Sequence, residues 1–97
     1  SRQPRLSFVH GGAVVKLIYF AWVRDKIGHS EETLAPPATV ATVGDLVAWL
    51  ATVSPGHAAA LADMSVVRCA VNQEYVDLSH PLATGDEVAF FPPVTGG

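Results

Sequence analysis

Two apolar runs near opposite ends of the sequence constrain the fold most. Residues 14–21 (VVKLIYFA) and 87–91 (EVAFF) are dense in β-branched and aromatic residues and contain neither glycine nor proline. Such runs are typical of strands that are buried on at least one face. Because these are the most apolar of the predicted strands, pairing them at the centre of one sheet buries both. The chain then leaves the sheet at the end of its last strand.

Shorter segments between these runs complete the predicted sheet. Residues 31–34 predict an edge strand, because the two prolines that follow cannot donate hydrogen bonds to a ladder. Residues 66–71 (VVRCAV) and 74–78 (EYVDL) predict a hairpin, in which Asn72 tolerates the positive φ of a tight turn.

One amphipathic helix is predicted in the middle of the chain. Thr42 can cap its N-terminus, and the carboxylate of Asp45 can reach back to the cap. Apolar residues recur at helical spacing at Val43, Leu46, Val47 and Leu50. Residues 22–28 and 57–62 predict shorter helical turns. The order of elements therefore predicts an α+β roll, a mixed sheet with one main helix packed on one face.

Composition limits the domain organisation and the classes of function. The 97 residues allow one domain, and 49% hydrophobic against 15% charged residues excludes a disordered chain. We interpret residues 1–13 as a flexible N-terminal extension or expression remnant and residues 14–97 as the domain. The net charge of −3, without a basic cluster, argues against a nucleic-acid partner. With no apolar run of membrane-spanning length, we expect a cytoplasmic protein that binds no membrane.

The C-terminal tail, residues 92–97, is the main candidate for a functional group. Pro92 and Pro93 stiffen the exit from the last strand, and the residues beyond them can extend by about 3.3 Å each. Gly96 and Gly97 have no side chain to obstruct a narrow channel. The α-carboxylate of Gly97 is ionised at neutral pH and can attack ATP. A terminal Gly-Gly by itself is more often a frayed end than a functional group. The apolar strand and the two prolines that precede it therefore decide the interpretation.

The closing sequence DEVAFFPPVTGG, the KLIYFA run and the intervening helix resemble the small subunit of molybdopterin synthase over residues 14–97. The resemblance implies a β-grasp, ubiquitin-like fold and the function of a sulfur carrier. It implies that an ATP-dependent enzyme adenylates the Gly97 carboxylate and that sulfur replaces AMP to form a thiocarboxylate. The large synthase subunit, in a heterotetramer, then receives the tail, and sulfur passes to cyclic pyranopterin monophosphate in molybdenum cofactor biosynthesis.

The same resemblance assigns roles to the tail residues. Gly97 is the only reactive residue, and the catalytic side chains are expected on the large subunit. The expected contacts with the partners are Phe91, Pro92, Pro93, Val94, Thr95 and Gly96. No tightly bound cofactor is expected, because ATP is used by the activating enzyme.

Two other sets of residues could carry chemistry. Cys69 is the only cysteine, so no intramolecular disulfide can form; we expect it in the core, because it shares a strand face with Val67 and Val71. The histidines match no spacing of metal ligands, so we predict no metal site and regard them as solvated. These are His10, His29, His57 and His80.

The two neighbouring phenylalanines of the last strand must face opposite sides of the sheet. We assign Phe90, with Val88, to the core. Phe91 then lies beside the prolines in an apolar patch where a partner can dock, unless a loop or helix covers it.

Three other functions remain compatible with the sequence. A sulfur carrier for thiamin or cysteine biosynthesis uses the same Gly97 chemistry, although the FFPPVTGG ending argues against it. A ubiquitin-like modifier joins Gly97 to lysines of target proteins through an isopeptide bond. A structural interaction module with an incidental tail is unaffected when Gly96 and Gly97 are removed.

Overall fold

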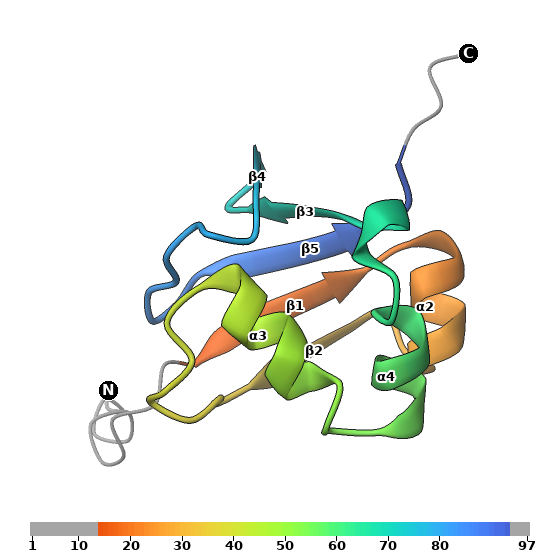
Figure 1. Cartoon of the computed structure of the whole chain (residues 1–97), viewed down its shortest axis with the longest axis horizontal. Helices are drawn as coiled ribbons and strands as arrows, with labels where there is room; N and C mark the ends of the chain where they lie inside the picture. Colours follow the sequence, from red (N-terminus) through yellow and green to blue (C-terminus); the bar gives the residue numbers. More distant parts are fainter. Residues whose placement is uncertain (1–13, 94–97) are drawn as a thin grey trace.

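A computed structural model describes residues 14–93 of the chain. It contains a five-stranded mixed sheet with the strand order β2-β1-β5-β3-β4 (Figure 1). Its strands are β1 (Val15–Tyr19), β2 (Glu31–Leu34), β3 (Arg68–Val71), β4 (Glu74–Val76) and β5 (Glu87–Phe91). β1 and β5 are parallel neighbours at the centre, and the other pairs are antiparallel. The predicted central pair and the predicted edge strand β2 are both confirmed.

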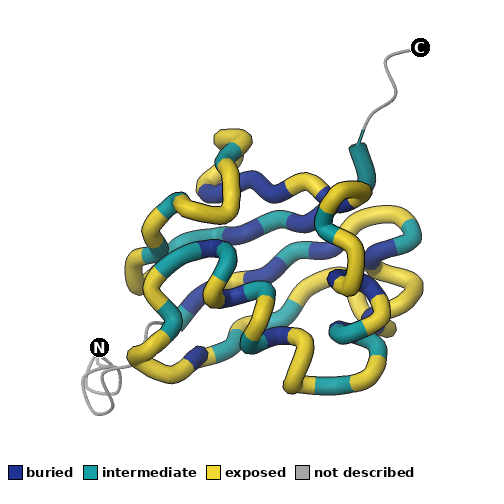
Figure 2. Tube along the Cα trace, in the orientation of Figure 1, coloured by how far each residue is buried: buried dark blue, intermediate teal, exposed yellow. Residues whose placement is uncertain are grey.

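The core lies on one face of this sheet, where buried and partly exposed residues alternate along the central strands (Figure 2). Leu17 of β1 is in register with Val88 of β5, and Tyr19 is in register with Phe90. These side chains are fully or almost fully buried. The prediction that Val88 and Phe90 belong to the core is therefore confirmed.

The helix α3 (Val43–Leu50) packs on this core with the predicted cap. The backbone N–H of Asp45 donates to Thr42 Oγ1 over 3.1 Å, and the N–H of Thr42 donates to Asp45 Oδ2 over 3.2 Å. This capping box satisfies two backbone donors at the helix start. The apolar side of α3 buries Val43, Leu46 and Leu50.

Two further helices lie close to the turns predicted from the sequence, and both start earlier than predicted, α2 by one residue and α4 by two. α2 (Ala21–Ile27) ends at Gly28, whose φ of 105° only glycine adopts easily. α4 (Pro55–Ala60) begins two residues before the predicted turn, because Ser54 caps it and Pro55 is suited to the first helical position. A Cβ on Gly56 would lie 2.5 Å from the carbonyl oxygen of Lys26, so α2 and α4 approach closely there.

Three predicted strands are shorter in the structure. β1 ends at Tyr19, because the chain turns at Ala21, whose φ is 54°, and enters α2. β3 starts at Arg68, because a 3₁₀ turn (Met64–Val66) occupies the residues before it. β4 stops at Val76, because the Asp77 carboxylate binds Ser79 in a local turn. The tight turn before β4 is confirmed, with φ of 52° at Asn72. Among residues 14–93, no helix is long and apolar enough to cross a membrane.

Candidate functional site

The last strand of the sheet determines where the C-terminal tail begins. β5 is hydrogen-bonded on both sides, to β1 and to β3, and its last residue, Phe91, is in register with Arg68. The N–H of Phe20 donates to the carbonyl of Phe90 over 3.1 Å. This hydrogen bond extends the pairing of β5 with β1 almost to Pro92. The tail therefore leaves from the rigid centre of the sheet. Four predicted tail residues lie outside the described residues: Val94, Thr95, Gly96 and Gly97.

An aromatic patch, formed by Phe20, Tyr75 and Phe91, lies next to this exit. The ring of Phe91 lies 5.5 Å from that of Tyr75 and 6.4 Å from that of Phe20, measured between centroids. Tyr75 is 74% exposed and Phe20 is 49% exposed. Phe91 itself is partly exposed, so no helix or loop of the described chain covers it fully.

The patch continues across the sheet face that is opposite the core. The register places Tyr75 beside Ala70, Ala70 beside Ala89, and Ala89 beside Ile18. This row joins four strands with small or apolar side chains. Exposed aromatic groups on an apolar face are typical of a surface that binds another protein.

A polar cluster on the core side connects β1, β2 and α4. The hydroxyl of Tyr19 donates to Glu32 Oε2 over 2.6 Å. Nε2 of His57 lies 2.6 Å from the same oxygen, and Nε2 of His29 lies 2.9 Å from Glu32 Oε1. His57 is only 3% exposed. The expectation that the histidines are solvated is therefore wrong for His57, because residues distant in the sequence enclose its ring.

The cluster keeps the Glu32 carboxyl ionised. Burial opposes its ionisation, but hydrogen bonds from Tyr19, His57 and His29 outweigh burial and lower its pKa. Burial, the hydrogen bond to Glu32 and the negative charge of Glu32 all raise the pKa of Tyr19. The sequence gives no signal for this cluster, because its members come from separate elements.

Comparison with known proteins identifies the family. The family model described as ThiS matches residues 17–97. The chain belongs to the ThiS family. Among curated relatives, the molybdopterin synthase sulfur carrier subunit of Escherichia coli is 45% identical over 84 residues, which cover 87% of this chain and 100% of that protein.

Solved structures confirm the predicted β-grasp, ubiquitin-like fold of this ThiS family chain. Small archaeal modifier protein 1 of Haloferax volcanii is 27% identical, with a TM-score of 0.68 over 86% of this chain and 100% of that chain. A Caldiarchaeum subterraneum ubiquitin has a TM-score of 0.53 at 18% identity, over 90% of this chain and 100% of its own, and shares the fold.

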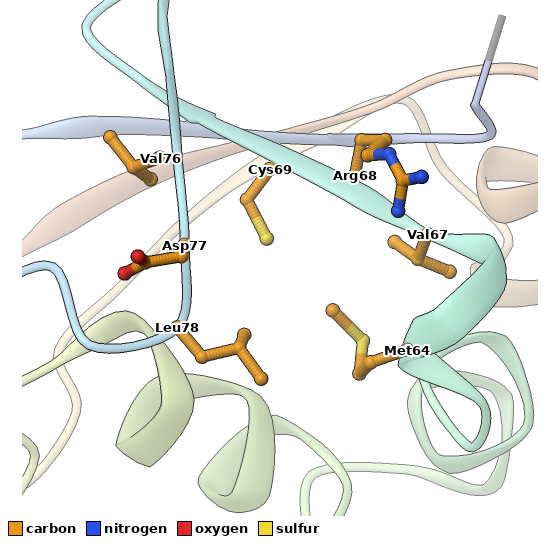
Figure 3. A pocket seen from close by; sticks show the side chains of 7 residues that line it. All are labelled: Met64, Val67, Arg68, Cys69, Val76, Asp77 and Leu78. Atoms are coloured by element: carbon orange, nitrogen blue, oxygen red, sulfur yellow. The ribbon is translucent and has the colours of Figure 1, made fainter.

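The one cysteine of this ThiS family chain is unsuited to carry sulfur. Cys69 borders a cleft of about 230 Å³ (Figure 3), yet it is only 5% exposed. Burial raises the pKa of its thiol to about 11, so the reactive thiolate is scarce at neutral pH. The cleft is lined by Met64, Val67, Arg68, Cys69, Val76, Asp77 and Leu78. The prediction that Cys69 belongs to the core is confirmed.

Proposed function

We propose that this chain is the sulfur carrier subunit of a molybdopterin synthase and that the α-carboxylate of Gly97 carries the sulfur. The observation that carries the proposal is the 45% identity to the E. coli sulfur carrier subunit over that protein's whole length. The central position of β5 and the burial of Cys69 support the terminal carboxylate over a side chain as the reactive group.

The proposed chemistry needs only the carboxylate from this chain. A carboxylate oxygen of Gly97 attacks the α-phosphate of ATP on an activating enzyme and releases pyrophosphate. Sulfur at the oxidation level of sulfide, delivered by a donor, then attacks the carbonyl carbon, displaces AMP and leaves a thiocarboxylate. The large subunit of the synthase binds the tail, and the sulfur passes to cyclic pyranopterin monophosphate while oxygen from water restores the Gly97 carboxylate. Glycine at the terminus lets two different enzymes approach the same carbonyl carbon without a clash.

The aromatic patch is the proposed docking surface for the large subunit, within a heterotetramer. It adjoins the first residues of the tail, so a partner seated there can receive the tail in a defined direction. Aromatic side chains dominate the binding energy of many protein interfaces. In this arrangement Phe91, Pro92 and Pro93 contact the partner first, and Val94, Thr95 and Gly96 follow along its channel.

The substitution Phe91→Ala is expected to weaken binding of the large subunit by at least about tenfold, because it removes the central ring of the patch. Titration of the purified subunits in a calorimeter measures the change. Val53→Ala is the matched control, because Val53 is also an exposed apolar residue but follows α3 on the core side of the sheet. Equal affinities for the two variants would contradict docking at the patch.

Intact mass spectrometry tests the carrier function directly. Incubation with the cognate activating enzyme, ATP and a sulfur donor is expected to add the mass difference between sulfur and oxygen, and fragmentation is expected to locate it at Gly97. The Cys69→Ser variant is expected to gain the same mass, because the thiol takes no part. Sulfur found on Cys69, or no gain at Gly97, would overturn the proposal.

A second candidate function is that of a protein modifier. It is favoured by the likeness to a small archaeal modifier protein, at 27% identity. A modifier ends in an isopeptide bond between Gly97 and a lysine of a target, and this adduct survives thiols and denaturants. A carrier instead returns with a free carboxylate after sulfur transfer, so denaturing electrophoresis of cell extracts separates the two functions.

A further inference from the structure

The polar cluster brings together three side chains that can bind a metal ion. His29 follows the end of α2, Glu32 belongs to β2, and His57 belongs to α4. One ligand atom from each residue lies within 4.8 Å of the other two. Figure 1 shows α2, α4 and β2 close to one another at one end of the sheet. The three ligands thus come from three elements that the fold itself holds together.

The groups behind these ligands are arranged as they are in metal sites. Ser54 Oγ lies 2.7 Å from His57 Nδ1, so this ring nitrogen can donate to the hydroxyl when a metal ion replaces the proton on Nε2. The hydroxyl of Tyr19 donates to the Glu32 carboxylate. Metal-binding histidines and carboxylates are oriented by such hydrogen bonds to their outer atoms. Ser54 also accepts the backbone N–H of His57 as the cap of α4, which fixes it in place.

We propose that His29, Glu32 and His57 form a binding site for a divalent transition-metal ion of the zinc class. Two imidazoles and one carboxylate are a common ligand set for Zn²⁺. At zinc–ligand distances of about 2.0–2.1 Å, tetrahedral ligand atoms are about 3.3 Å apart. The present distances from Glu32 are 2.6 Å to His57 and 2.9 Å to His29, so they need to open by about 0.7 and 0.4 Å. One ligand atom of each residue already lies within 4.8 Å of the other two, so side-chain rotations can bring all three to one ion. The metal then takes the place of the protons now shared between the histidines and Glu32.

The ion has a route to the site from solvent. The His29 side chain is 47% exposed, whereas Glu32 and His57 lie behind it. Three protein ligands leave one tetrahedral position for water on this exposed side. Because the site joins β2 to α4 and leaves the tail untouched, the proposal is independent of the sulfur-carrier function.

Calorimetric titration of the tag-free full chain with Zn²⁺ tests the site. We expect one ion to bind per chain, and we expect Zn²⁺ to raise the melting temperature by several degrees, because the ion binds only the folded arrangement. Co²⁺ is expected to give the visible absorption of a tetrahedral complex. Mg²⁺ at the same concentration is expected to give no binding, because imidazole is a poor ligand for it.

The variant His29→Gln removes one ligand from the surface and leaves the buried part of the cluster intact. We expect it to weaken Zn²⁺ binding by at least about tenfold and to abolish the rise in melting temperature. His80→Gln, a histidine outside the cluster, is the matched control and is expected to bind like the wild type. Glu32→Gln, which keeps the shape of the side chain, is a second ligand variant for the same Zn²⁺ titration. Equal Zn²⁺ affinity in His29→Gln and wild type, or no binding by the wild type, would overturn the proposal and leave the cluster as a hydrogen-bonded network.

Discussion

Deleting Gly97, or replacing it with valine, is expected to abolish sulfur transfer while the domain stays folded. Deletion withdraws the terminal carboxylate by one residue, about 3.3–3.6 Å along an extended chain. A misplacement of about 1 Å at reacting atoms can already cost about 100-fold in rate. Valine keeps the length of the tail but places a branched side chain beside the carboxylate. Formation of sulfurated product, with the activating enzyme, ATP, a sulfur donor and the large subunit present, is expected to fall by more than about 100-fold.

A truncation at the opposite end provides the control for this experiment. Residues 1–13 are predicted to lie outside the domain, so their deletion is expected to leave sulfur transfer unchanged. Among residues 14–93, the buried core extends from Val15 to Phe90, and both truncations leave this part of the chain intact. Melting temperatures within a few degrees of the wild type verify that each variant is folded. A normal rate of product formation by either Gly97 variant would contradict the assigned role of the terminal carboxylate.

Much of the fold can be predicted from short-range sequence patterns. The apolar runs predict the central strands, because pairing them at the centre of the sheet buries both. Thr42 and Asp45 predict the start of α3, because a capping box depends on residues only three positions apart. Asn72 predicts the hairpin turn for the same reason, since its backbone conformation depends on local chemistry.

The parts that sequence patterns missed depend on contacts between distant segments. Glu32 and His57 are 25 residues apart, and no periodic pattern relates a strand residue to a residue of a later helix. The aromatic patch is a similar case. Strand alternation predicts an exposed Phe91, but Phe20 and Tyr75 join it only because β1 and β4 lie on either side of the β5–β3 pair. Strand order and register, which single segments do not encode, decide both features.

The neighbouring phenylalanines of β5 give the second large expected effect, which concerns stability. Phe90→Ala is expected to lower the free energy of unfolding by about 3–5 kcal/mol, the usual cost of truncating a buried phenylalanine. Its ring is fully buried and stacks on Tyr19, with centroids 6.2 Å apart and an angle of 16° between the planes. It is also in register with Tyr19 on one side and Cys69 on the other, so the cavity opens in the middle of the sheet. Urea denaturation followed by circular dichroism measures the loss.

Phe91→Ala is the matched control, because it makes the same chemical change one residue further along the same strand. The Phe91 ring points to the open face, where its substitution removes the contacts with Phe20 and Tyr75, so the expected cost is about 1 kcal/mol. A domain of this kind is stable by about 5–15 kcal/mol in total, so Phe90→Ala removes a much larger share of the free energy of unfolding than Phe91→Ala. Comparable losses in the two variants would mean that both faces of β5 are packed, and the open face would then no longer be available to a partner.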